Sequence, residues 1–305
     1  MMSAVRDGGM GVVMGVSREE SLQLSSILLI KALISTRWKP RGGMLRKKTV
    51  QVDTAHVAGV RVTPQELTPD TKNYLRETLI FTLQIPPPLP FSSAIRNSIC
   101  AIVAKIGRSD TASDFPALLP TLLQSLPGNN FTTNCLNKLL KELSMQRILL
   151  HKKNFALISS SSFPIVMKLF TDYCNQLSPA LTSADPTGLM SVNQDLLLHF
   201  KIMTKIANKL LVNTLPSLLS TAETVNLVGL FFSSSLTLLD LLCAALLRIP
   251  TDHPVHITLL KVLSRLASTA VETQANYPLQ FAPFLAPHLS FFHRALVSCT
   301  AAKHP

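Results

Sequence analysis

The stretch SAIRNSICAIVAKIGR, residues 93–108, carries isoleucine at positions 95, 99, 102 and 106. Intervals of three and four residues place these four side chains on one face of an α-helix. Residues 190–211 and 255–273 show the same kind of apolar stripe, and lysines occupy other positions of the former. Because each such helix has one apolar face that needs a neighbour, the sequence predicts helices that pack against helices.

The composition of the 305-residue chain favours the same fold class. It contains only 11 glycines and 6% aromatic residues, and leucine fills most of the apolar positions. β-Sandwiches and barrels need more β-branched and aromatic residues, and nucleotide-binding α/β folds need glycine-rich loops. A chain with 47% hydrophobic and 15% charged residues is expected to fold. We therefore expect an all-α protein.

The predicted helices follow one another in pairs, separated by proline-containing or polar loops. Successive pairs start about 40 to 70 residues apart, which brackets the period of HEAT and armadillo repeats. No single pair can bury its own apolar face, so stacked pairs form a continuous core. The expected fold is an α-solenoid of HEAT-type antiparallel helix pairs. The pairs are 22–38 with 69–83, 93–108 with 114–126, 132–149 with 153–177, 190–211 with 217–248, and 255–275 with 280–300.

Three parts of the chain are distinguished on this basis. Residues 1–21 lack the features of a secretory signal and are expected to form a disordered tail. Residues 22–92 form a first repeat that contains a polar loop at 39–68, and residues 93–305 form the repeat array. A basic run without any acidic residue opens the loop, and it is either a site for phosphates or acidic proteins or a solvated segment. Its basic residues are Arg37, Lys39, Arg41, Arg46, Lys47 and Lys48.

The charge and the cysteines restrict partners and compartment. The chain has 29 Lys and Arg against 17 Asp and Glu, a formal net charge of +12. This balance favours anionic partners without choosing among nucleic acid, an acidic protein and a membrane surface. The odd number and wide spacing of the cysteines argue against a disulfide framework or a zinc site, and favour apolar core positions in a reducing compartment. The cysteines are Cys100, Cys135, Cys174, Cys243 and Cys299.

Motifs that carry catalytic chemistry are missing from the sequence. No segment matches a P-loop, a dinucleotide fingerprint, a nucleophile elbow or a metalloprotease helix. His253 and His256 are the nearest approach to a metal-binding pair, but Pro254 interrupts them and no cysteine is near. We interpret this segment as a loop and a helix start. The sequence therefore predicts no enzyme, no cofactor, no metal and no small-molecule substrate.

One segment, residues 225–249, is long and apolar enough to cross a bilayer. Asp240 would cost about 2.5–3.5 kcal/mol near the bilayer centre, whereas each Leu or Phe contributes about 0.3–0.6 kcal/mol. The sum is near zero once the serines and Asn226 are included. Two interpretations remain, a membrane span and a buried solenoid helix, and the amphipathic neighbouring segments favour the buried helix.

KIGRSDTASDFPALLPTLLQSL, residues 105–126, resembles a landmark of the importin-β superfamily of transport receptors, the karyopherins. In an early HEAT repeat of that family a helix ends in Ala-Lys-Ile-Ala-Arg-like residues. A short turn with Asp follows, and Trp-Pro-x-Leu-x-Pro opens the next helix. Phe115 stands here where the family has tryptophan. The matching residues are Ala104, Lys105, Ile106, Arg108, Asp110, Phe115, Pro116, Leu118 or Leu119, and Pro120.

Other stretches are similar to the same family. LSSILLIKALISTRWKP (24–40) resembles its N-terminal domain, where a helix carries a lysine and then a tryptophan, and Lys31 and Trp38 fit those places. Residues 68–80 look like the short helix that follows. Residues 199–213 are similar to the first helix of the fifth repeat in the importin-eleven branch. Family receptors are much longer, so the chain resembles the N-terminal part of a receptor or a shortened relative. They are also usually acidic, whereas this chain is basic.

This resemblance implies a nuclear transport receptor that binds the GTP form of the small GTPase Ran, carries protein cargo and meets nuclear pore proteins. Such a protein would be found in the cytoplasm, the nucleus and the nuclear envelope. By analogy, Ran would dock on the second helices of the early pairs. The alternatives are a HEAT-repeat scaffold without Ran dependence, a membrane protein anchored by 225–249, and a nucleic-acid binder that only the net charge supports. The partner-binding residues expected are Lys31, Trp38, Lys72, Arg76, Glu77, Lys168 and Asp172.

Overall fold

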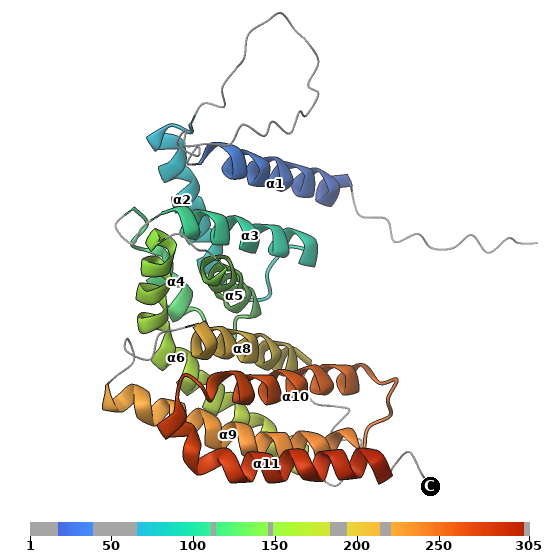
Figure 1. Ribbon diagram of the computed structural model, residues 1–305. Coiled ribbons are helices and arrows are strands. Elements are labelled where there is room, and N and C mark those ends of the chain that lie inside the picture. Colours follow the sequence, from blue (N-terminus) through green and yellow to red (C-terminus); the bar gives the residue numbers. More distant parts are fainter. Residues whose placement is uncertain are drawn as a thin grey trace, which may run out of the picture.

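The computed structural model describes residues 18–38, 66–110, 114–145, 149–183, 194–213 and 221–301. Within these ranges it contains ten α-helices and no strand, which confirms the all-α prediction (Figure 1). The helices are α1 (Arg18–Arg37), α2 (Pro69–Gln84), α3 (Ser93–Ser109), α4 (Leu118–Gln124), α5 (Asn130–Ser144), α6 (Leu149–Thr182), α8 (Gln194–Asn213), α9 (Ala222–Leu246), α10 (Pro254–Thr273) and α11 (Pro278–Ala301).

The helices form two layers that run the length of the stack. In one, α1 packs on α3, α3 on α5, α5 on α8, and α8 on α10. In the other, α2 packs on α4, α4 on α6, α6 on α9, and α9 on α11. We call them the A layer and the B layer. The first member of each predicted pair lies in the A layer and the second in the B layer, as expected for a HEAT-like solenoid (Figure 1).

The apolar stripes predicted from the sequence form the core. All four isoleucines of α3 are buried, because the helix lies between α1 and α5. Further along the stack, Phe170 of α6 contacts both Phe200 of α8 and Phe231 of α9, with ring centroids 5.4 and 4.8 Å apart. Phe232 then contacts Phe281 of α11 at 5.0 Å. These rings join both layers across successive repeats, so the core is continuous along the solenoid.

Close packing of α3 against α4 and α5 depends on Gly107, in the last turn of α3. A Cβ atom at this position would lie 2.9 Å from side-chain atoms of both Leu118 and Leu139. These leucines belong to α4 and α5, so the glycine lets α3 approach both helices. Close packing therefore explains why a glycine stands at this position of the stretch 105–126.

Helix boundaries follow recognisable caps. The side chains of Thr68, Ser92, Asn129 and Thr221 accept hydrogen bonds from backbone N–H groups in the first turns of α2, α3, α5 and α9. His253 caps α10 in the same way, since its Nδ1 accepts from the N–H of Val255, and Pro254 follows it. This confirms the interpretation of the two histidines as a loop and helix start.

Some boundaries differ from the prediction. α1 starts at Arg18, so four residues assigned to the tail 1–21 are helical. α4 is shorter than the predicted segment 114–126, because a turn precedes Leu118. Residues 1–17 of the predicted tail and 39–65 of the predicted basic loop lie outside the described residues. The flanks of that loop are adjacent, since the N–H of Leu67 donates to the carbonyl of Arg37 at 3.0 Å.

α9 is the one helix of the described ranges that is long and apolar enough to cross a membrane. In the structure it packs against α6, α10 and α11, and its buried side chains include Phe231, Phe232 and Leu239. Asp240, which made the sequence ambiguous, pairs with Arg294 of α11 at 2.7 Å, and both side chains are largely exposed. The carboxylate therefore faces the surface of the stack.

Three of the predicted core cysteines, Cys100, Cys135 and Cys174, are buried, and Cys243 is half-buried. The wide sequence spacing hides one proximity. The Cys135 thiol of α5 donates to Cys100 Sγ of α3 at 3.1 Å. These two thiols meet because α3 and α5 are neighbours in the A layer.

Candidate partner-binding site

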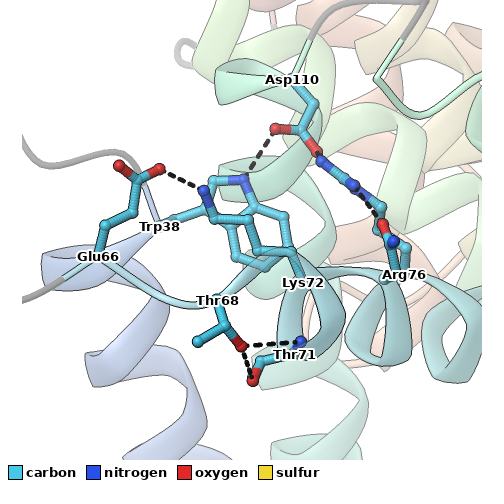
Figure 2. A network of polar contacts seen from close by, with 8 residues as sticks. Trp38, Glu66, Thr68, Thr71, Lys72, Arg76 and Asp110 are labelled. Carbon is cyan, nitrogen blue, oxygen red and sulfur yellow. Dashed lines mark hydrogen bonds and ion pairs between the residues drawn. The ribbon is translucent and has the colours of Figure 1, made fainter.

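Three of the predicted partner-binding residues, Trp38, Lys72 and Arg76, meet at the first step of the stack (Figure 2). Trp38 follows the last residue of α1 and is only 2% exposed. Its indole Nε1 donates to Oδ1 of Asp110, directly after α3, at 2.8 Å. The end of the first A-layer helix is thereby fixed to the end of the second.

Arg76 of α2 completes the pairing of Asp110. Its Nε and Nη2 donate to Oδ2 of Asp110 at 3.0 and 2.8 Å, and its guanidinium carbon lies 5.5 Å from the Trp38 ring centroid. The Asp110 side chain is only 1% exposed. Burial removes water from the Asp110 carboxylate, which costs free energy. The guanidinium of Arg76 and the indole N–H of Trp38 replace that water and offset the cost.

Neighbouring polar groups extend this cluster to other helices. Lys72 lies over the Trp38 ring, with Nζ 5.8 Å from the centroid, and forms an ion pair with Glu66. Asn154 of α6 donates to the backbone carbonyl of Asp110 at 3.3 Å. We call Trp38, Lys72, Arg76 and Asp110 the Trp38 cluster. It joins α1, α2 and α3, and the hydrogen bond from Asn154 connects it to α6, so it holds the first repeats together.

The remaining predicted residues do not join the Trp38 cluster. Glu77 is exposed on α2, beside a hollow of about 420 Å³ that Phe81 and Phe115 also line. Lys168 and Asp172 are exposed one turn apart on α6, also in the B layer. Lys31 is half-buried on α1 in the A layer, which separates it from the B-layer residues.

Two residues of the site, Asp110 and Asn154, were not predicted as site residues. Asp110 belongs to the landmark stretch, so its sequence context carries a signal, but nothing local assigns it to Trp38. No pattern in α6 points to Asn154. Long-range contacts of this kind arise from stacking, which places residues of different repeats side by side.

The Trp38 cluster consists of an indole, two cationic side chains and one carboxylate in mutual contact. Within the described ranges no three His, Cys, Asp or Glu residues are grouped so as to hold a metal ion. His199 is the most strongly perturbed histidine there, because burial lowers its pKa to about 4. Its Nε2 contacts the hydroxyls of Thr133 and Tyr173 at 3.0 and 3.3 Å, which places it in a buried hydrogen-bonded cluster.

Comparison with known proteins identifies one relative in two species. Human importin-11 is 23% identical over 151 residues, 48% of this chain and 15% of that protein. Mouse importin-11 is 22% identical over 236 residues, 76% of this chain and 23% of that protein. No protein-family model and no solved structure matches. The chain spans less than a quarter of the length of these relatives. Over most of its own length it is distantly similar to importin-11, and this similarity relates it to the importin-β karyopherins.

Proposed function

We propose that the protein acts as a nuclear transport receptor, or as part of one, that binds Ran in its GTP form and carries protein cargo through the nuclear pore. The observation that carries this proposal is the similarity to importin-11 over 76% of the chain. The stacked helix pairs support it, because a solenoid offers a long surface and can change curvature by small rotations at each repeat. No catalytic step is part of this proposal.

The exposed B-layer residues are the proposed Ran contacts. Glu77, Lys168 and Asp172 present charged groups to solvent on α2 and α6. Trp38, Lys72 and Arg76 contribute indirectly, since the Trp38 cluster holds α2 in place against α3 and α1. Lys31 is retained as a proposed contact for a partner on the A layer.

A binding experiment with the purified chain tests this assignment. Ran loaded with a non-hydrolysable GTP analogue should be retained by the immobilised protein, and Ran loaded with GDP should not. The charge reversals Glu77→Lys and Asp172→Lys should weaken binding about tenfold or more, which corresponds to about 1.4 kcal/mol. Glu272→Lys is the matched control, because it makes the same change of charge at an exposed position of the A-layer helix α10. Failure of the GTP form to bind contradicts the proposal for this chain.

The alternative function is a HEAT-repeat scaffold that binds proteins without Ran. The same fold supports it, because the solenoid surface does not depend on a nucleotide switch. Partner capture that is indifferent to Ran-GTP would favour the scaffold, whereas release or recruitment of partners by Ran-GTP favours the receptor.

The proposed localisation is the cytoplasm, the nucleus and the nuclear envelope. Fluorescence imaging of the tagged full chain tests it. Carbonate extraction tests the membrane alternative at the same time, since a protein anchored by α9 would stay in the membrane pellet. A packed α9 predicts release into the supernatant.

A further inference from the structure

The A-layer helices carry more positive charge than the B-layer helices, and five of their basic residues lie on the neighbouring helices α8 and α10. Lys201, Lys205 and Lys209 are spaced by four residues on α8, so they lie along one face of that helix. Lys261 and Arg265 have the same spacing on α10. Because α8 packs against α10, the two basic rows border one surface.

A hollow of about 440 Å³ lies between these rows. The side chains of Lys201, Lys205, Lys261 and Arg265 line it, together with smaller polar residues and Leu260. We call this hollow and its continuation along both helices the basic groove. Lys261 and Arg265 are exposed, and Lys201 and Lys205 are half-buried, so all four charges are accessible from solvent.

The charges of the basic groove are not neutralised within the described part of the chain. No carboxylate there forms an ion pair with Lys201, Lys205, Lys261 or Arg265. Burial, followed by the charges of Lys205 and Lys261, lowers the pKa of Lys201. Unpaired cations held this close together stabilise a bound anion.

Exposed apolar side chains also border the groove. Leu198 of α8 and Ile257 of α10 are 44% and 46% exposed, and Leu260 beside the hollow is 49% exposed. A second hollow, of about 200 Å³, lies between the first turns of the same two helices, and its lining combines Leu198 and Val255 with polar residues that include Gln194 and Asp195. Three exposed apolar side chains therefore lie next to the cations on the same two helices.

We propose that the basic groove binds an acidic segment of a partner protein that also carries apolar side chains. Its carboxylates would pair with the four cations, and its apolar side chains would cover Leu198, Ile257 and Leu260. A nucleic acid fits less well, because the residues lining the groove include no aromatic ring on which a base could stack. The groove lies in the A layer, so this interaction does not depend on Ran binding to the B layer.

Fluorescence polarisation with a labelled peptide of glutamates and leucines tests the proposal on the full chain. The wild-type protein should bind this probe, with an affinity that falls as salt rises. A peptide with glutamine in place of glutamate should bind at least tenfold more weakly. Binding of both peptides with equal affinity would overturn the proposal, because the cations would then contribute nothing.

Matched variants locate the site. Lys201→Glu combined with Lys261→Glu should weaken binding of the acidic peptide at least tenfold. Lys152→Glu combined with Lys153→Glu makes the same change of charge at exposed positions of α6, and should have little effect. An equal loss of peptide affinity in the two double variants would show that only the net charge of the protein matters, and would contradict binding at the basic groove.

Further measurements distinguish a peptide from a nucleic acid as the ligand, and distinguish this proposal from the proposed Ran binding. Leu198→Ser should weaken the leucine-containing peptide but not a peptide of glutamates alone. An unlabelled single-stranded oligonucleotide should compete poorly, and stronger competition by the oligonucleotide than by the peptide would assign the groove to nucleic acid and overturn the proposal. The Lys201 and Lys261 double variant should retain Ran-GTP binding if the chain has it, so the two proposals fail independently.

Discussion

The indole nitrogen of Trp38 donates a hydrogen bond to Asp110 at 2.8 Å, although the two residues are 72 positions apart in the chain. The bond joins the end of α1 to the end of α3. Arg76 of α2 binds the other oxygen of the same carboxylate, so one buried side chain connects three helices. The first step of the solenoid therefore depends on a polar joint as well as on apolar packing.

Removal of this carboxylate should destabilise the protein strongly. Asp110→Ala leaves the guanidinium of Arg76 and the N–H of Trp38 without their partner in a buried place, which is expected to cost about 3 kcal/mol. Urea unfolding followed by far-UV circular dichroism measures this loss. Asp240→Ala is the control, because the exposed pair with Arg294 contributes at most about 1 kcal/mol. Equal effects of the two substitutions would contradict a structural role for the Asp110 joint.

Two glycines of the helices should respond to substitution in opposite directions. Gly107→Val is expected to lower the free energy of unfolding by about 1–3 kcal/mol, because even a Cβ atom would lie 2.9 Å from Leu118 and Leu139. Gly229→Ala in α9 should raise it by about 0.5–1 kcal/mol, since the added Cβ would meet no atom within 4 Å beyond the nearby backbone of its own helix, and alanine favours the helix. Thermal unfolding of both variants checks the prediction, and destabilisation by Gly229→Ala would contradict it.

Stability should fall as the pH drops from 6.5 towards 4, in part because of His199. Its pKa is about 4 in the folded protein, against 6.5 for an ordinary histidine, because burial disfavours the charged ring. The unfolded chain therefore binds a proton in this window that the folded chain excludes, and about 2 kcal/mol of stability is lost. Other groups also titrate here, so the measurement is a comparison of urea midpoints for wild type and His199→Gln. The variant should lose less stability over the same window, and an unchanged pH dependence would contradict the assignment.

The buried thiols should react slowly while the protein is folded. Burial raises the pKa of Cys174 to about 12, and burial together with the contact to Cys100 raises the pKa of Cys135. The reactive thiolate is therefore scarce at both positions. Iodoacetamide labelling followed by mass spectrometry should modify the half-buried Cys243 before Cys100, Cys135 and Cys174, and urea should remove the difference. Rapid native labelling of Cys135 would contradict the packing of α3 against α5.

Local patterns were sufficient for the helices and their pairing. The isoleucine spacing in 93–108 predicts a one-sided helix, and all four isoleucines are buried in α3. The predicted pair 132–149 with 153–177 corresponds to α5 and α6, which pack against each other. Such predictions succeed because helical periodicity is a local property, and because a helix with one apolar face needs a partner.

Local patterns were insufficient for the site. Lys72 and Arg76 were predicted as partner-binding residues from their place on a second helix, and nothing local showed that they lie on Trp38 and pair with Glu66 and Asp110. The basic groove was likewise hidden, since its two rows lie on segments about 60 residues apart. The net charge predicted an anionic partner but did not show which residues of the folded protein form a basic surface.

The sequence by itself determined that the chain forms helices, approximately which segments they occupy, and that they stack in successive pairs. Only the tertiary structure decided that Trp38 and Asp110 meet, that Cys100 lies against Cys135, and that two basic rows border one groove. The physical reason is that helix formation depends on spacings of three or four residues within one segment. Contacts between helices depend on how the repeats stack, which sets which distant residues become neighbours.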